Sequence, residues 1–136
     1  MKPLNLDANV LVRFLVQDDP KQSPAATKLM ADAQSGVCEL LLDPMIVAET
    51  VYVLAGQYKR PRVDVADTLL AIVRSPYLRA EQELVLIDAL LRFRNHGVDF
   101  ADAWLGAKAA SGSHDIASFD RDLDKFKDVK RIEPKT

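Results

Sequence analysis

The sequence predicts an α/β fold, with a central, mainly parallel sheet covered by helices on both faces, in a single domain over residues 1–136. Short apolar runs of strand length alternate with longer segments whose apolar residues recur every three or four positions, as in amphipathic helices. This alternation is typical of parallel sheets. The 136 residues are 49% hydrophobic and 28% charged, which is ordinary for one folded domain.

The N-terminal half is expected to contain two strands and three helices. Apolar runs predict strands over residues 3–6 and 37–42, and patterning predicts helices over 10–16, 23–34 and 44–58. Two helix starts carry a specific signal, because Ser23-Pro24 and Asp43-Pro44 each place a capping side chain directly before a proline. Ser35-Gly36 is expected to end the second helix.

The C-terminal half is expected to be mostly helical and to end in two short strands. Apolar residues at helical spacing predict a helix over 62–73. The elements expected after it are helices over 81–95 and 99–111, with Gly112 ending the second, a strand over 115–119, a helical turn over 122–126 and a final strand over 129–132.

Charge and cysteine content exclude several classes of protein. The net charge of −2 is not the strongly basic balance typical of many nucleic-acid binders, so a polyanionic substrate would need another means of attachment. Cys38 is the only cysteine, which excludes an intramolecular disulfide and predicts a buried thiol in a reducing cytoplasm. No apolar run approaches the roughly 20 residues of a membrane span, and Asp7 interrupts the first apolar stretch, unlike in a signal peptide.

Asp7 and Glu49 are isolated carboxylates in apolar segments. Asp7 follows the first expected strand, and ligand sites in parallel α/β sheets lie beyond the carboxyl ends of the strands. The alternative is that Asp7 caps the helix that follows. Glu49 is the only charged residue from Pro44 through Gln57, so we expect apolar surroundings and hence a cation, a hydrogen-bonding partner or a raised pKa. The alternative is a solvent-facing position on an amphipathic helix.

Asp99 and Asp102 are three residues apart and fall near one face of the same expected helix. Asp99 follows Gly97-Val98 and is expected to be the N-cap of that helix. Asp102 lies one turn inside the expected helix, where no capping role explains it, and is a candidate ligand. Phe100 and Trp104, spaced by four, are expected to pack in the core and not to stack on nucleobases.

Asp120 follows another expected strand and is again placed at a carboxyl end. Asp122 and Asp124 alternate with Arg121 and Lys125, a pattern typical of a solvated helix start.

Four of these carboxylates are the strongest candidates for a functional site, namely Asp7, Glu49, Asp102 and Asp120. They would converge only around a shared ligand, because unpaired like charges repel. Oxygen-rich clusters suit hard cations such as Mg²⁺ or Mn²⁺. Other chemistries have little support, since no Gly-rich phosphate loop, nucleophile elbow or zinc motif is present. His96 and His114 lack metal-ligand spacing and are expected at the surface.

Four segments of the chain together resemble the PIN-domain family, and within it the VapC-type toxins. They are Leu6–Leu11 (LDANVL), Ile46–Leu54 (IVAETVYVL), Val98–Ala107 (VDFADAWLGA) and Ala117–Leu123 (ASFDRDL). They extend over nearly the whole chain and keep the family's order of acidic motifs. Trp104 and Gly106 stand where the family more often has smaller or aliphatic residues.

The resemblance implies a three-layer α/β/α fold with a central parallel sheet, and RNA cleavage that depends on Mg²⁺ or Mn²⁺. A toxin of this kind is usually paired with a small antitoxin and commonly forms a homodimer, so both partners are expected. By motif, the resemblance assigns a catalytic, metal-binding acidic quartet, which is Asp7, Glu49, Asp102 and Asp120. Asp99 is an ambiguous fifth acid. Asn9 and Ser118 are the polar residues expected to support the site.

In such a site the metal would activate a water, orient it in line with the scissile phosphate and offset charge on the phosphoryl oxygens. It would also make an acidic pocket receptive to phosphate. Scattered basic residues could add a cationic rim, although solvated surface is the alternative for each of them. These residues are Arg13, Lys59, Arg60, Arg62 and Lys108.

Two other functions are compatible with parts of the sequence. Residues 7–11 also resemble the opening loop of haloacid-dehalogenase-like phosphatases, but that loop normally has a second aspartate where this chain has Asn9. A PIN-like module that binds RNA or a protein without cutting is the other alternative. The intact acidic quartet argues against it, because a binding domain gains nothing from carboxylate repulsion.

Overall fold

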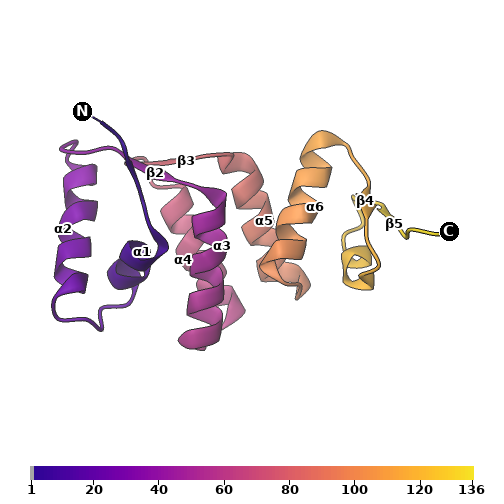
Figure 1. Ribbon diagram of the computed structural model, residues 1–136, viewed down its shortest axis with the longest axis horizontal. Coiled ribbons are helices and arrows are strands. Elements are labelled where there is room, and N and C mark those ends of the chain that lie inside the picture. Colours follow the sequence, from indigo (N-terminus) through magenta and orange to yellow (C-terminus); the bar gives the residue numbers. More distant parts are fainter. Residues whose placement is uncertain (1) are drawn as a thin grey trace. The chain divides into compact units, whose positions relative to one another are not determined.

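The structure is a computed structural model that describes residues 2–136 (Figure 1). Contacts divide the chain into a first unit that ends at Glu83 and a second unit, Leu84–Thr136. Each unit has its own small sheet, and every strand pairing in residues 2–136 is parallel. None of the helices in these residues is long and apolar enough to cross a membrane.

The first unit is built on a three-stranded parallel sheet in the order β1-β2-β3. Leu40 of β2 pairs with Leu4 of β1 and with Leu78 of β3. The strands are β1 (Leu4–Asn5), β2 (Leu40–Leu42) and β3 (Leu78–Ala80), and the helices are α1 (Ala8–Leu15), α2 (Gln22–Gln34), α3 (Pro44–Tyr52), the π-helix η1 (Val53–Gln57) and α4 (Arg62–Val73). The core contains fully buried aliphatic side chains from sheet and helices, including Leu11, Leu40, Leu42, Val47, Leu54 and Leu69.

The start of α2 differs from the prediction that Ser23 is its N-cap. The helix begins at Gln22, and Oδ1 of Asp19 accepts hydrogen bonds from the backbone N–H groups of Lys21 (2.9 Å) and Gln22 (2.7 Å). Ser23 lies inside the helix and is buried, and its hydroxyl donates to the carbonyl of Val16. Asp19 therefore satisfies the free donors that the sequence assigned to Ser23.

The predicted start of α3 is confirmed, but the expected helix does not stay α-helical to Tyr58. Oδ1 of Asp43 accepts a hydrogen bond from the backbone N–H of Met45 (2.8 Å), and Pro44 is the first helical residue. From Val53 to Gln57 the chain is a π-helix.

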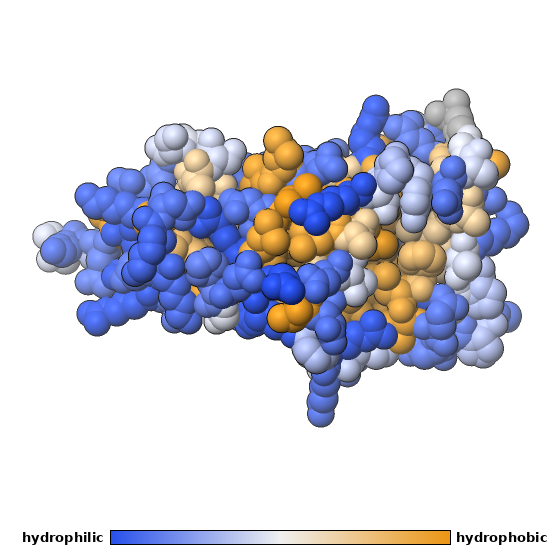
Figure 2. All heavy atoms as spheres, turned by 180° about the vertical axis from the view of Figure 1, so that it is seen from behind, coloured by the Kyte–Doolittle hydropathy of each residue, from blue (hydrophilic) through white to orange (hydrophobic). Residues whose placement is uncertain are grey.

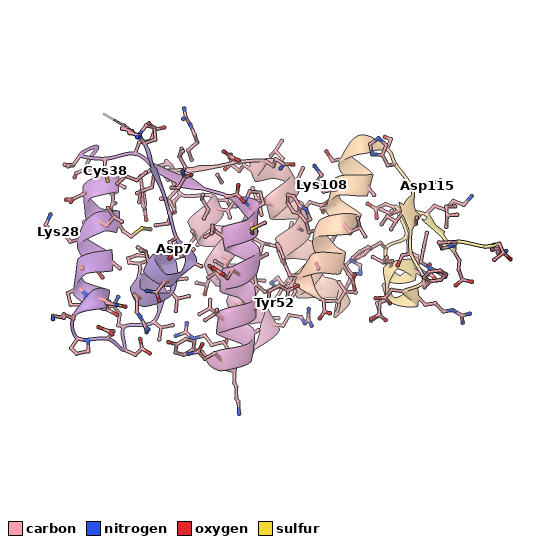
Figure 3. The ribbon with its side chains drawn as sticks, in the orientation of Figure 1. Asp7, Lys28, Cys38, Tyr52, Lys108 and Asp115 are labelled. Carbon is pink, nitrogen blue, oxygen red and sulfur yellow. The ribbon has the colours of Figure 1, made fainter. Side chains whose placement is uncertain are left out.

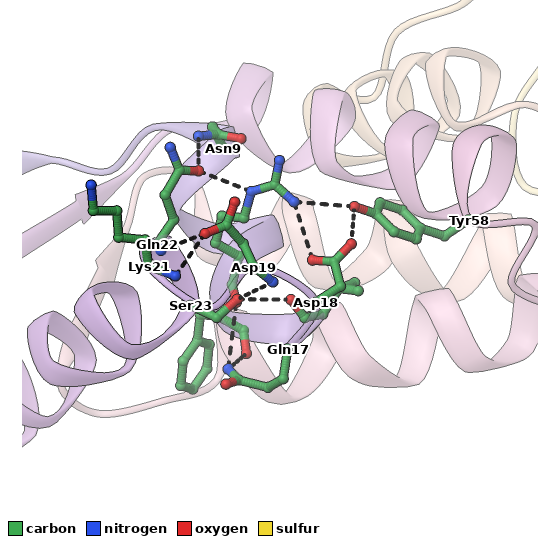
Figure 4. A network of polar contacts seen from close by, with 11 residues as sticks. Asn9, Gln17, Asp18, Asp19, Lys21, Gln22, Ser23 and Tyr58 are labelled. Carbon is green, nitrogen blue, oxygen red and sulfur yellow. Dashed lines mark hydrogen bonds and ion pairs between the residues drawn. The ribbon is translucent and has the colours of Figure 1, made fainter.

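A polar network joins the end of this π-helix to α1 and to the loop before α2 (Figure 4). The guanidinium of Arg13 donates to Asp18 (3.1 Å), to Gln22 (3.0 Å) and to the Tyr58 hydroxyl (3.4 Å). That hydroxyl donates in turn to Asp18 (3.0 Å), and the Asn9 amide donates to Gln22 (3.4 Å). Arg13 is thus a structural cross-link of the first unit.

The second unit contains two helices followed by a two-stranded parallel sheet. Its elements are α5 (Glu83–His96), whose first residue still belongs to the first unit, α6 (Phe100–Gly112), β4 (Ile116–Ala117), the 3₁₀-helix η2 (Arg121–Lys125) and β5 (Arg131–Ile132). Ile116 pairs with Arg131 across the sheet. The helix was expected to stop at Ser111, with Gly112 ending it, but it includes Gly112, and Ser113 adopts the left-handed conformation that ends it (φ 57°).

The ring of Phe126 is a central packing element of this unit. It is buried, lies edge-on to His96 with centroids 5.3 Å apart, and has the Arg92 guanidinium 4.9 Å from its centroid. A Cβ at position 106 would lie only 2.5 Å from the ring. Gly106, unusual for the resembled family, therefore allows α6 to approach Phe126 closely.

Other expectations about burial are only partly confirmed. Phe100 is buried, with its ring centroid 6.2 Å from that of Phe93, as predicted for a core residue. Trp104 is only half-buried, with the Lys108 ammonium 5.8 Å from its ring centroid. Cys38 is half-buried, not fully buried as expected. His96 and His114 are exposed, which confirms their predicted surface positions.

Candidate active site

Three carboxylates of the second unit converge. Asp102, Asp120 and Asp122 each offer an oxygen, and these three atoms lie within 4.8 Å of one another. Asp102 is in the first turn of α6, while Asp120 and Asp122 come from the start of η2, just after β4. We call these three residues the acidic cluster.

The turn that carries Asp120 is held by hydrogen bonds on both sides. Its backbone N–H donates to Oγ of Ser118 (2.9 Å), and its own Oδ1 accepts from the backbone N–H of Asp122 (2.9 Å). The Ser118 carbonyl accepts from Nη1 of Arg131 on β5 (3.0 Å). The position of the Asp120 carboxylate is therefore fixed by its local backbone and by the neighbouring strand.

The electrostatic environment of Asp102 disfavours its charge. Partial burial raises the pKa of its carboxyl, and the charge of Asp120, a hydrogen bond to Asp120, and the charges of Asp99 and Asp122 raise it further. A cation would reverse this effect, because it would favour the ionised form of all these carboxylates. The residues present therefore fit a hard divalent cation, whose preferred ligands are carboxylate oxygens.

Asp99 and Asp122 each differ in part from the role that their sequence positions suggest. Asp99 is at the N-cap position of α6, as predicted, but its side chain makes no capping hydrogen bond there. Its charge instead acts on Asp102. Asp122 is exposed at a helix start, as predicted, yet its carboxylate belongs to the acidic cluster. The feature that brings Asp122 into the cluster is the hydrogen-bonded turn from Asp120 to Asp122, which places the Asp122 carboxylate beside that of Asp120.

Asp7 and Glu49 belong to the first unit. Asp7 lies where the chain passes from β1 into α1 (Figure 3), is exposed, and makes no capping hydrogen bond although it is at the N-cap position. The alternative of a structural cap is therefore wrong. Glu49 is exposed on α3, in a shallow pocket beside Met45 and Tyr52. Glu49 is therefore solvent-facing, the alternative that the sequence left open, although its neighbours in this pocket are largely apolar as expected.

The comparison with protein families agrees with this site. A family model described as the PIN domain matches residues 5–129, and the chain belongs to that family. Membership confirms the predicted α/β fold class with parallel strands and is consistent with a three-layer α/β/α fold. The matching model is that of the PIN domain and not that of the haloacid-dehalogenase-like phosphatases, which residues 7–11 also resemble. No curated protein matches the sequence.

PIN domains are generally metal-dependent nucleases, and this membership supports a hydrolase that acts on nucleic acids. The acidic cluster provides the donor set that such chemistry needs.

Proposed function

We propose that this protein is an endoribonuclease that requires Mg²⁺ or Mn²⁺, and that it is the toxin of a type II toxin–antitoxin pair acting in the cytoplasm. The observation that carries the catalytic proposal is the convergence of Asp102, Asp120 and Asp122 in a PIN domain. The toxin assignment rests on the resemblance of four motifs to VapC-type toxins. A small antitoxin and a second copy of this chain are the partners that this resemblance suggests.

Within the second unit, Asp102 and Asp120 are the proposed metal ligands, and Asp122 is close enough to join them. A divalent ion bound there would supply a Lewis acid and a positive charge next to the phosphate. Ser118 acts as a positioning residue, because its hydroxyl accepts the Asp120 N–H and so fixes the direction of that carboxylate. Asp99 adds negative charge that strengthens the attraction for a cation.

Asp7 and Glu49 are proposed as the remaining acids of the quartet, on the basis of their motifs. Two features support this proposal: both side chains are exposed, and the Asp7 carboxylate is not used to cap α1. Asn9, two residues after Asp7, is proposed to support this segment through its hydrogen bond to Gln22.

The experiment is cleavage of a panel of single-stranded and structured RNAs, with Mn²⁺ or Mg²⁺ and with excess EDTA. Asp102→Asn should lower the rate by roughly 100-fold or more, because removing one electrostatic group of an active site typically costs that much. Asp7→Asn and Glu49→Gln should also lose most activity. Asp115→Asn is the matched control, since it removes an exposed carboxylate elsewhere in the second unit (Figure 3) and should keep wild-type activity.

Undiminished cleavage in excess chelator would contradict the metal mechanism. Metal-dependent RNA binding without any cleavage would instead identify a non-catalytic PIN-like module. Co-purification with the product of an adjacent short reading frame, and loss of activity in that complex, tests the toxin assignment separately.

A further inference from the structure

Phe119 is the one phenylalanine of the five in this chain whose side chain is exposed. Its exposed fraction is 71%, whereas Phe100 and Phe126 of the same unit are 1% and 2% exposed. It directly precedes Asp120 of the acidic cluster. A large aromatic ring is therefore left in solvent on the residue next to one of the carboxylates that the proposed function uses.

The backbone around Phe119 is held on both sides. The Ser118 N–H donates to the carbonyl of Ile132 (3.1 Å), and the Ser118 carbonyl accepts from Arg131 (3.0 Å). On the other side, the Asp120 N–H donates to Oγ of Ser118 (2.9 Å). The ring is thus attached to a hydrogen-bonded turn, so binding a partner there has little backbone to order.

A hollow next to this turn is polar, and its lining has one more cation than it has carboxylates. The C-terminal end of the chain shows mostly hydrophilic side chains on the face in Figure 2, where it lies at the left. The hollow, of about 600 Å³, is lined by three cations, two carboxylates and one apolar side chain. Arg131 hydrogen-bonds both carboxylates. The lining residues are Arg121, Arg131, Lys135, Asp124, Glu133 and Ile132.

We propose that Phe119 stacks on a nucleobase of a single-stranded nucleic acid, next to the phosphate that the acidic cluster acts on. Arg121 and Lys135 in the adjacent hollow then attract a neighbouring phosphate. This inference rests on the proposed nuclease function and adds the substrate class to it. Stacking on a side chain needs an unpaired base with a free face, which loops, ends and single strands offer and a continuous duplex does not.

This location differs from the one considered in the sequence. The pair Phe100 and Trp104 is not this surface, because Phe100 is buried, as the sequence predicts. Phe119 looked like the end of a strand. β4 ends at Ala117, so Phe119 lies outside the strand, and its side chain is exposed.

The experiment measures binding of a single-stranded oligonucleotide that carries the fluorescent base 2-aminopurine, as RNA and as DNA of the same sequence, in Ca²⁺. Stacking of 2-aminopurine on an aromatic ring quenches its emission, so the readout does not depend on turnover. Phe119→Ala should weaken single-strand binding by roughly 5- to 150-fold, the range expected for loss of one base–aromatic stack. The quenching should disappear with it.

Three further variants make the result specific. Phe119→Trp should keep both affinity and quenching, while Phe119→Leu, which keeps apolar area but no aromatic face, should lose the quenching. Leu84→Ala is the matched control, because Leu84 is another exposed apolar side chain of this unit (81%). It should bind like wild type, and all variants should fold because the substituted side chains are exposed.

The inference and the proposed function fail in different ways. If wild type cleaves single-stranded RNA and Phe119→Ala binds and quenches as wild type does, the inference is wrong and the nuclease proposal stands. If wild type cleaves no RNA but shows quenching that depends on Phe119, the stacking site stands and the nuclease proposal is wrong. Absence of single-strand binding by wild type overturns the inference, and the cleavage assay then decides the function alone.

Discussion

Two groups of aspartates in the second unit are in opposite electrostatic situations. Asp124 and Asp128 each pair with an arginine, whose hydrogen bonds lower the pKa of these carboxyls. Asp102 faces Asp120 and Asp122, and burial together with its acidic neighbours raises its pKa. The paired aspartates stabilise the folded chain, whereas the acidic cluster without a cation costs stability. The contrast separates the residues that stabilise this unit from those that the proposed function uses.

The pair formed by Arg92 and Asp128 is the strongest example of the first group. Arg92 is 8% exposed, and its guanidinium binds both oxygens of Asp128 and one of Asp88 (3.0 Å). It also lies over the Phe126 ring. Because Asp128 is half exposed, solvent screens part of this interaction, and the arginine's own packing contributes much of its value.

Arg92→Met is expected to have the largest effect on stability. It removes two charge-assisted contacts but keeps an apolar stem, so we expect a loss of about 2–3 kcal/mol in the free energy of unfolding. Urea unfolding measures it. Lys28→Met is the control, since it breaks an exposed pair with Asp32 and should cost no more than about 0.5 kcal/mol. Equal effects of the two variants would show that Arg92 is no more than a surface charge.

The packing that accompanies this pair gives a second, smaller effect. Gly106→Ala would normally stabilise a helix, but here the new Cβ would meet the Phe126 ring, which Arg92 and His96 hold from the other helix. We expect a loss of about 1–3 kcal/mol from overpacking, in the lower part of that range if the ring shifts. Gly56→Ala should be neutral or stabilising, because no atom lies within 4 Å of its added Cβ. A stabilised Gly106→Ala protein would mean that Phe126 is loosely held.

Much of the fold could be predicted because its signals are local. The cap at Asp43, the glycine after α2 and the apolar spacing of α4 each lie within one turn of the element that they specify. β3 was missed because only one of its three residues, Leu78, is buried, so no apolar run marks it. Its strand character comes from pairing with β2, which the sequence does not display.

The site was harder to predict than the fold. Asp102, which stands in an apolar segment, and Asp120, which follows one, were candidates from the sequence and lie together in the acidic cluster, but Asp122 has the pattern of ordinary helix-start charge. Which exposed carboxylates meet depends on a turn geometry set by Ser118 and Arg131, far apart in the sequence. The exposure of Glu49 could not be decided from the sequence for a related reason, since apolar neighbours in sequence do not fix which side of a helix is covered.

The smallest expected effect is a pair of opposite pH trends in protein without metal. The pKa of Asp128 is lowered in the folded state, so its stabilisation is present above the unfolded value of 3.8 and is lost as pH falls through the folded pKa. The pKa of Asp102 is raised, so the folded state binds more protons than the unfolded state just above pH 3.8, and stability declines as pH rises through the folded pKa.

Asp128→Asn should therefore be less stable than wild type at neutral pH, with the gap closing in acid. Asp102→Asn should gain on wild type as pH rises, by no more than roughly the 0.5 kcal/mol typical of exposed substitutions. Thermal melts of the three proteins in EDTA across pH 3 to 8 test both trends, and adding Mn²⁺ should reverse the order of Asp102→Asn and wild type, because a ligand of the folded state stabilises only the protein that binds it. If Asp102→Asn loses stability relative to wild type with rising pH in EDTA, its carboxylate is paired like that of Asp128, and the contrast between the two groups is wrong.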